Sequence, residues 1–280
     1  MSPEDFDYVR RLVFERAAIV LDSDKGYLVT SRLVPVARDQ GYDSIGAVVS
    51  ALRGGRAAEL SALVVEAMTT NETSFFRDVH PFDALRDQVI PEVMAARAGA
   101  RRLNVWCAAC SSGQEPYSIA MMLLDNFPEL QDWTVRLVAT DLSVEMVDRA
   151  RSGTYSQFEV NRGLPARYLP RHFVRNGTSW TVSDSIRAMV DFRTMNLIEA
   201  WPLLPAMDIV FMRNVLIYFD PDRKRDLLGR VHGVLAGDGY LFLGGAETTI
   251  NLHDGFERVP INRASCYRRR DPVLAGGSAR

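Results

Sequence analysis

The sequence predicts an α/β protein in which a Rossmann-like, doubly wound parallel sheet follows a separate all-helical N-terminal domain. Three observations support this fold class. Residues 4–70 show helical periodicity and no strand pattern, and strand and helix patterns alternate from residue 103 onward. Residues 155–192 interrupt the alternation with short runs around Asn176-Gly177, a strong hairpin signal. We therefore expect a small antiparallel β-subdomain, over about residues 165–192, inserted into the sheet.

The bulk composition excludes several classes of protein. A chain of 280 residues can bury a large core, and its net charge of −2 gives no support for nucleic-acid binding. The acidic start, MSPEDFD, is not a secretory signal, and no apolar run approaches the length that crosses a bilayer. Three cysteines fit a reducing compartment. We expect a cytoplasmic protein without membrane insertion or a nucleic-acid partner.

The N-terminal domain is expected to span residues 1–70. Pro35 should kink or end the second of its helices, and Ser44 should cap the third. Its helical segments cover about residues 6–17, 27–39, 44–52 and 58–68. A basic face is one interpretation of its cations, and a solvated surface with interspersed acids is the other. The cations concerned are Lys25, Arg32, Arg38, Arg53 and Arg56.

Residues 71–102 are expected to form a linker and the first helix of the second domain. The run TTNETSFFRDVHPF, from Thr69, combines capping residue types with bulky phenylalanines. A capped helix start that packs its aromatic rings on the core is the structural interpretation. Arg77, however, follows two phenylalanines, and a guanidinium held there could fix a carboxylate in a chosen orientation.

The stretch 104–120, NVWCAACSSGQEPYSIA, predicts a ligand cradle. Val105 to Cys107 read as a strand, small residues follow, and Pro116 opens a helix. A strand, a small-residue loop and a helix N-terminus let the backbone approach a ligand closely. The loop has one glycine, Gly113, instead of the dinucleotide pattern G-x-G-x-x-G. Glu115 would repel a pyrophosphate and favours a cationic ligand, such as S-adenosylmethionine.

Two other interpretations of this stretch are weaker. The run from Trp106 to Cys110 imitates the W-C-x-x-C of thioredoxin-like proteins, but the chain is far longer than one such domain and Glu115 would disfavour a thiolate. A structural zinc needs four ligands, and Cys266 and the scattered histidines show no paired spacing. We expect no metal.

The strands that follow deliver polar residues at their carboxyl ends. Strands are predicted at 103–107, 134–140, 190–193, 207–212, 240–244 and 264–267, and helices at 115–126, 143–152 and 222–235. Asp141 follows the second strand, where open α/β sheets bind ligands, and its oxygens suit a ribose diol. Ser143 is the better helix cap. Arg213 and Asn214 follow a buried strand and are hard to explain as packing. The tail from Arg268, and at least residues 269–280, is expected to be disordered.

Taken together, these segments resemble the CheR-type chemotaxis receptor methyltransferases, which are protein-glutamate O-methyltransferases. The resemblance covers about residues 5–268, and the motifs are specific as an ordered set. They are NETSFFRD from Asn71, WCAACSSGQEPYSIAM from Trp106, ATDLS from Ala139, ARSGTY from Ala150, MNL from Met195 and FMRNVLIYFD from Phe211.

The resemblance implies a class I methyltransferase domain over residues 103–268 that binds S-adenosylmethionine and releases S-adenosylhomocysteine. It implies that Arg77 and Tyr218 position the substrate. By motif position, it implies cofactor contacts from Asn71, Thr73, Arg77, Glu115, Asp141, Asn196, Leu197, Arg213 and Asn214.

The implied partner is the acidic cytoplasmic helical bundle of a methyl-accepting chemotaxis receptor, whose glutamates accept the methyl group. The family's N-terminal domain is thought to meet this bundle, which favours a functional basic face. In some members the β-subdomain also binds a C-terminal receptor tether. Here the hairpin loop NGTS, from Asn176, is short and lacks a glycine-bearing extension, which argues against tether binding.

Three alternative functions fit the sequence less well. A methyltransferase for nucleic-acid amines usually carries N-P-P-Y where this chain has Arg213-Asn214-Val215-Leu216, although another protein substrate fits the same fold. A module that binds S-adenosylmethionine without turnover is disfavoured by the intact Arg77, Arg213 and Tyr218. A nicotinamide dehydrogenase lacks its glycine fingerprint here.

Overall fold

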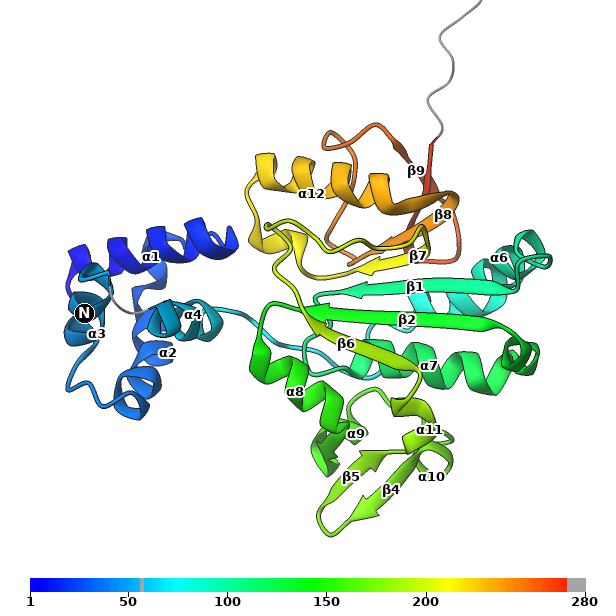
Figure 1. Cartoon of the computed structure of the whole chain (residues 1–280), viewed down its shortest axis with the longest axis horizontal. Coiled ribbons are helices and arrows are strands. Elements are labelled where there is room, and N and C mark those ends of the chain that lie inside the picture. The colour runs from blue at the N-terminus through cyan, green and yellow to red at the C-terminus, as the bar shows by residue number, and fades with distance from the viewer. Residues whose placement is uncertain (56–57, 271–280) are drawn as a thin grey trace, which may run out of the picture.

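The computed structural model describes residues 1–55 and 58–270 of the chain. Figure 1 shows a small helical unit, in blue, joined by an extended segment to a larger α/β unit that carries a small sheet at its lower edge. This arrangement confirms the predicted fold class. Among the described residues, no helix combines the length and the apolar character needed to cross a membrane.

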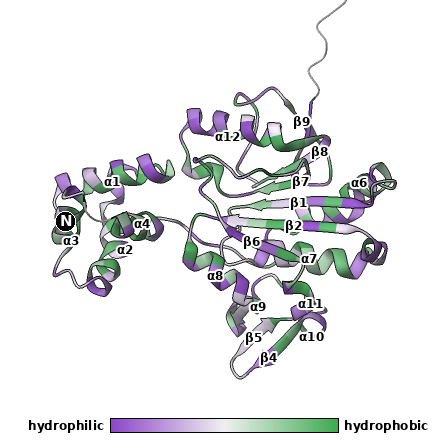
Figure 2. Cartoon of the chain, in the orientation of Figure 1, coloured by the Kyte–Doolittle hydropathy of each residue, from purple (hydrophilic) through white to green (hydrophobic). Residues whose placement is uncertain are grey.

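The helical unit has its own apolar core. Its helices are α1 (Pro3–Ala17), α2 (Gly26–Asp39), α3 (Ile45–Arg53) and α4 (Ala58–Ala67), with a 3-10 turn, η1 (Ser23–Lys25), before α2. Figure 2 shows hydrophobic and hydrophilic residues alternating around α1, as expected for a helix with one buried face. Ser44 caps α3 as predicted, because its side chain accepts a hydrogen bond from the Ala47 N–H at 3.1 Å.

Pro35 does not end α2, which continues to Asp39. Proline removes one helical hydrogen bond. The stripe formed by Val29, Leu33 and Ala37 is buried on both sides of that gap, and its packing holds the helix together. Of the predicted basic residues, Arg56 lies outside the described residues.

The main sheet has seven strands in the order β6-β2-β1-β7-β8-β10-β9. The first five are parallel, whereas β10 is antiparallel to both β8 and β9. The strands are β1 (Arg102–Ala108), β2 (Thr134–Asp141), β6 (Val190–Thr194), β7 (Met207–Met212), β8 (Leu235–Leu243), β9 (Phe256–Val259) and β10 (Ser265–Arg269).

Alternate residues of each central strand enter two different cores. In β1, Val105 and Cys107 pack in the core that includes α7 (Gln114–Asn126) and α8 (Val144–Ser152). Trp106 and Ala108 pack in the core that includes α12 (Pro221–Val234). Side chains along a strand point alternately to the two faces of the sheet. Because helices cover both faces here, the central strands are buried along their length. Only the carboxyl and amino ends of the strands therefore remain for polar functions.

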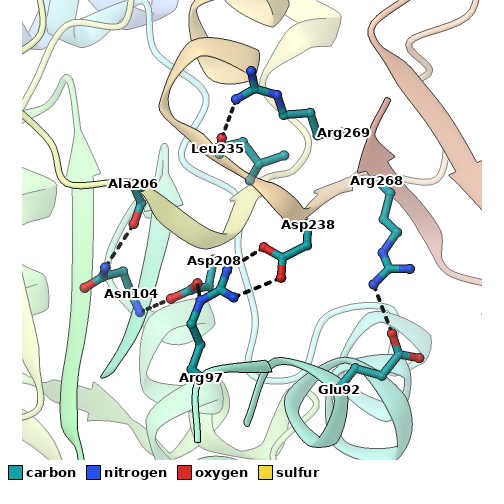
Figure 3. A network of polar contacts seen from close by, with 9 residues as sticks. All are labelled: Glu92, Arg97, Asn104, Ala206, Asp208, Leu235, Asp238, Arg268 and Arg269. Carbon is teal, nitrogen blue, oxygen red and sulfur yellow. Dashed lines mark hydrogen bonds and ion pairs between the residues drawn. The ribbon is translucent and has the colours of Figure 1, made fainter. Parts of the chain in front are cut away.

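At the amino ends, a polar network ties the strands to the helix before them (Figure 3). The preceding segment comprises α5 (His80–Ala84), a π-helical turn, η2 (Leu85–Val89), and α6 (Ile90–Ala96). Arg97, just after α6, donates to Asp208 at 2.9 Å and also binds Asp238. Asp208 accepts the Asn104 N–H at 2.8 Å. These side chains use their hydrogen-bonding groups on one another, so we assign this end of the sheet a role in stability.

The inserted subdomain is a three-stranded antiparallel sheet in the order β3-β5-β4. Its strands are β3 (Thr154–Ser156), β4 (Phe173–Asn176) and β5 (Ser179–Val182), with short helices α9 (Gln157–Asn161), α10 (Leu169–His172) and α11 (Asp184–Arg187). The predicted hairpin is present, but Asn176 pairs with Ser179, so Gly177 occupies the first central position of the turn. Its φ of +59° suits glycine there.

Three strand predictions needed revision. β9 had no predicted counterpart, because its four residues alternate too briefly to stand out. β8 begins at Leu235, inside the predicted helix end. β10 includes Arg268 and Arg269, which pair with β9, so the expectation of disorder from Arg268 is wrong for these two residues. Arg270 is also described, and its N–H donates to the Gly255 carbonyl at 2.8 Å, so the expectation is wrong there as well. Residues 271–280 lie outside the described residues.

Candidate active site

One pocket lies at the carboxyl ends of β1, β2, β6 and β7, between the two units of the chain. All the predicted site residues line it: Asn71, Thr73, Arg77, Glu115, Asp141, Asn196, Leu197, Arg213, Asn214 and Tyr218. Parallel strands place their carboxyl ends at one edge, which is why residues far apart in the sequence meet here. The helical unit and the linker contribute Ala17, Ile19 and Met68, which the sequence did not indicate.

The turn between β1 and α7 is tightly constrained. Gly113 has a φ of +93°, and a Cβ on it would lie 2.9 Å from the Cβ of Ala150 in α8. Only glycine tolerates both the conformation and the contact. Ala109 and Ser111, in the same turn, also have positive φ values, of 60° and 50°. Non-glycine residues in this region cost energy, and they cluster at functional sites.

Glu115 and Arg213 form a buried ion pair in the pocket. Arg213 Nη1 donates to Glu115 Oε2 at 2.9 Å, and Nη2 donates to Asp78 at 2.7 Å and to the Arg77 carbonyl at 3.0 Å. The Arg213 side chain is 1% exposed. Burial raises the pKa of Glu115, and the charge of Arg213 opposes that rise. Glu115 Oε1 has no hydrogen-bond partner among the described residues, so it remains available to a ligand.

Asp141 is held by backbone donors. Its Oδ2 accepts the Ser111 N–H at 2.7 Å, and its Oδ1 accepts the Ser143 N–H at 3.0 Å. Ser143, not Asp141, caps α8 through the Met146 N–H, as predicted. Burial raises the pKa of Asp141, and these backbone hydrogen bonds oppose the rise. Each carboxylate oxygen can accept a further hydrogen bond from a hydroxyl.

Arg77 lies in a strained loop and keeps free donors. Phe76, Asp78 and Val79 have φ values of 47°, 66° and 36°, and this is a rare conformation for a β-branched valine. Arg77 Nη1 donates to the Glu72 carbonyl at 2.7 Å. The remaining guanidinium N–H groups have no partner among the described residues. Arg213 is thus an internal counter-ion, whereas Arg77 can still bind an anion.

The loop that carries Arg77 is packed against the inserted subdomain. The Phe75 ring lies edge-on to Tyr155 at 5.0 Å between ring centroids, and Phe76 stacks on Tyr168 at 4.9 Å. Gly163, with a φ of +89°, approaches so closely that a Cβ would lie 2.1 Å from the Phe75 carbonyl oxygen. The subdomain therefore fixes the backbone just before Arg77.

The remaining predicted residues form the other walls. Asn196 donates to the Arg16 carbonyl at 2.7 Å, and its Oδ1 accepts the Ile198 N–H at 3.2 Å, so its side chain shapes a turn. Leu197 is buried. Asn71 accepts a hydrogen bond at its carbonyl from Ser111 Oγ at 2.8 Å. The hydroxyls of Thr73 and Tyr218 have no hydrogen-bond partner within the described part of the chain.

Two functional neighbours escaped the sequence analysis. Asp78 forms an ion pair with Arg213. It directly follows Arg77 in the sequence, but only Arg77 was predicted to belong to the site. Glu247 is buried and accepts the N–H groups of Asn214, at 2.8 Å, and of Gly244, at 2.6 Å. Asn214 has a φ of 57°, so Glu247 supports a strained residue of the pocket. The acid in the run GGAETT, after a strand, was the available signal.

The redox interpretation of Cys107 and Cys110 fails physically. Both thiols are buried and free, and burial raises the pKa of each well above its ordinary value. A thiolate, the reactive form, is therefore disfavoured. Within residues 1–55 and 58–270, no group of three or more histidine, cysteine or acidic side chains is placed to hold a metal ion.

The charges of the pocket suit a cationic ligand and a separate anion. Three acids, Glu72, Glu115 and Asp141, line it against two arginines, and Arg213 is committed to Glu115 and Asp78. The free oxygen of Glu115 and the oxygens of Asp141 can hold a positive group and hydroxyls. Arg77 can hold a carboxylate nearby.

Comparison with known proteins agrees with this chemistry. Residues 71–265 match the family described as CheR methyltransferase, SAM binding domain, and residues 4–69 match CheR methyltransferase, all-alpha domain. The chain is 43% identical over 271 residues to chemotaxis protein methyltransferase 1 of Pseudomonas aeruginosa, covering 95% of this chain and 98% of that one. It is 35% identical over 258 residues to the chemotaxis protein methyltransferase of Salmonella typhimurium, covering 90% and 86%. The chain belongs to the CheR methyltransferase family.

Proposed function

We propose that this enzyme methylates glutamate side chains of a chemotaxis receptor, forming methyl esters, with S-adenosylmethionine as the donor. The observation that carries the proposal is the juxtaposition in one pocket of buried carboxylates, Glu115 and Asp141, with the free donors of Arg77 and Tyr218. The first pair suits a cationic donor. The second pair suits an anionic acceptor.

The residues that line the pocket support binding of S-adenosylmethionine. When bound, this cofactor supplies an electrophilic methyl group on a sulfonium. Glu115 Oε1 would bind its ammonium group, and Asp141 would accept hydrogen bonds from the ribose hydroxyls. Asn196 and the buried Leu197 would border the adenine. The walls around it would be completed by the other predicted residues that line the pocket, Asn71, Thr73, Arg213 and Asn214.

Arg77 and Tyr218 are proposed to orient the acceptor. A glutamate carboxylate has an ordinary pKa of about 4.3, so it is ionised at neutral pH and needs no general base. Arg77 would bind the carboxylate through its free N–H groups, and the Tyr218 hydroxyl, which lines the same pocket, would donate a further hydrogen bond to it. Positioning of this kind can supply about 7–11 kcal/mol in favourable cases. The enzyme's own residues thus align the acceptor and exclude water.

The proposed partner is the helical cytoplasmic bundle of a receptor, which places the enzyme in the cytoplasm. Of the basic residues first considered for this contact, Arg32 instead donates to the carbonyls of Met68 and Thr69, at 2.7 and 2.8 Å. Lys25 and Arg38 are on the surface beside Asp24 and Asp39. The short hairpin loop favours a receptor contact without a tether peptide.

Methyl transfer to a purified receptor cytoplasmic domain tests the proposal. Tritiated S-adenosylmethionine should label receptor glutamates, and mild base should release the label as methanol, because esters are base-labile. A base-stable label would indicate another class of acceptor. Cofactor binding without any labelling would indicate a sensor instead of an enzyme, and either result would overturn the proposed reaction.

Arg77→Ala tests the assignment of the acceptor site. Turnover should fall about 100-fold, because the carboxylate loses its alignment, while S-adenosylhomocysteine affinity by calorimetry changes little. Arg258→Ala, an exposed arginine on β9, is the matched control and should change neither. Equal losses of rate and affinity in Arg77→Ala would contradict this role.

A further inference from the structure

A carboxylate of the helical unit lies behind the pocket and holds the turn that carries Asp141. Glu66 of α4 accepts hydrogen bonds at Oε1 from Ser143 Oγ and from the Glu145 N–H, the latter at 2.9 Å. Ser143 in turn donates its N–H to Asp141. The first N–H groups of a helix have no partner within the helix. Here α8 is capped jointly by its own Ser143 and by a residue of the other unit.

Each unit also contributes an apolar residue to the core of the other unit. Leu142, between Asp141 and Ser143, packs against the core of the helical unit. Ala18, just after α1, is fully buried in a core of the α/β unit. An anion at the start of a helix is favoured by the helix dipole. At the turn that carries Asp141, Glu66 therefore adds a helix cap and a favourable charge to the apolar packing between the units.

Other contacts from the helical unit also end on residues of the pocket. Asn196 donates to the Arg16 carbonyl at 2.7 Å, and the Val20 N–H donates to the Tyr218 carbonyl at 3.0 Å. Arg32 holds the carbonyls of Met68 and Thr69, which line the pocket. The helical unit therefore contacts the proposed ribose side through Glu66, the adenine side through Arg16, and the acceptor side through Val20. The pocket is complete only when the two units are docked.

We infer that Glu66 is a positioning residue that controls cofactor affinity from the helical unit, by fixing Ser143 and the turn that carries Asp141. This inference rests on the proposed function, because it takes the pocket as the S-adenosylmethionine site. Glu66 itself does not line that pocket. Its effect passes through Ser143 and Leu142. Any ligand of the helical unit that shifts α4 would change cofactor affinity through the same contacts.

Binding of S-adenosylhomocysteine to Glu66→Ala and Glu66→Gln tests the inference. Glu66→Ala should weaken binding about tenfold in calorimetry, because the Glu145 N–H and Ser143 Oγ lose their partner. Glu66→Gln keeps an oxygen that can accept the Glu145 N–H and should recover most of the affinity. With saturating donor, turnover of Glu66→Ala should return close to the wild-type rate. Glu59→Ala, an exposed acid on the same helix, is the matched control.

Hydrogen exchange of the ligand-free protein gives a second, independent readout. The first turn of α8 should exchange faster in Glu66→Ala than in the wild type, whereas Glu59→Ala should match the wild type. If Glu66→Ala binds S-adenosylhomocysteine as tightly as the wild type and merely melts earlier, the inference is overturned. If the wild type itself does not bind, the proposed function fails, and unchanged exchange in Glu66→Ala would separately overturn the capping role.

Discussion

Replacing Arg213 by methionine would isolate the ion pair on which the pocket depends. The substitution keeps a long apolar side chain beside Phe82 but removes the only cation that contacts Glu115 among the described residues. Glu115 would remain buried without a counter-ion. Arg213 also binds Asp78 and the Arg77 carbonyl. The Asp78 side chain is 55% exposed, so water replaces that ion pair at little cost.

The expected loss of stability is large. Removing one partner of a buried ion pair costs about 3–5 kcal/mol, because the other charge stays desolvated. Removing both charges is far less damaging. Arg213→Met/Glu115→Gln should therefore be more stable than Arg213→Met alone, although it carries the additional substitution.

The pH dependence has a definite sign. Burial already raises the pKa of Glu115 above its ordinary value, and loss of Arg213 raises it further. An acid with a raised pKa in the folded state holds its proton there, so stability falls as the pH rises from the ordinary pKa through the folded one. The loss of stability in Arg213→Met, relative to the wild type, should thus be smallest below pH 4.5 and increase as the pH rises. The affinity of this variant for S-adenosylhomocysteine should instead increase as the pH rises, because Glu115 must ionise to bind an ammonium group.

Urea unfolding followed by circular dichroism, at a series of pH values, measures the deficit. Calorimetric titration at the same pH values measures affinity. The double variant should regain stability and lose the pH dependence, but it should not regain binding. A deficit independent of pH, or a double variant no more stable than Arg213→Met, would refute the argument that an unpaired Glu115 is responsible.

Two further predictions concern the subdomain and the thiols. Gly163→Ala should lower turnover about 100-fold while S-adenosylhomocysteine affinity is largely kept, because a Cβ 2.1 Å from the Phe75 carbonyl oxygen displaces the loop before Arg77. Gly177→Ala, with a positive φ but open space around it, is the control, and equal losses in both variants would exclude this explanation. A thiol reagent at about pH 8 should label Cys107, Cys110 and Cys266 only after unfolding, because burial raises the pKa of all three. Rapid labelling of native Cys107 or Cys110 would contradict that.

The fold class and the edge of the sheet that binds ligands could be predicted because they depend on local patterns. Strand and helix alternation fixes a parallel sheet, and a parallel sheet brings the ends of its strands together. Asp141 and Arg213 could therefore be placed at one edge without knowing the strand order. Ser44 and Ser143 could be assigned as caps because a cap needs only its own helix.

The pairings inside the pocket could not be predicted in this way. Glu115 and Arg213 are 98 positions apart, and their contact depends on β1 lying beside β7. Glu66 acts across the boundary between two units, so neither unit's pattern indicates it. The expectation that Pro35 could end α2 was wrong for a related reason, since tertiary packing of α2 outweighed a local preference.

The tip of the β4–β5 hairpin leaves room for a longer loop. The space around Gly177 is open, and lengthening a surface loop is cheap, about 0.6 kcal/mol for each doubling. A longer loop, or a grafted peptide segment, should accordingly be tolerated at this tip while the pocket keeps its geometry.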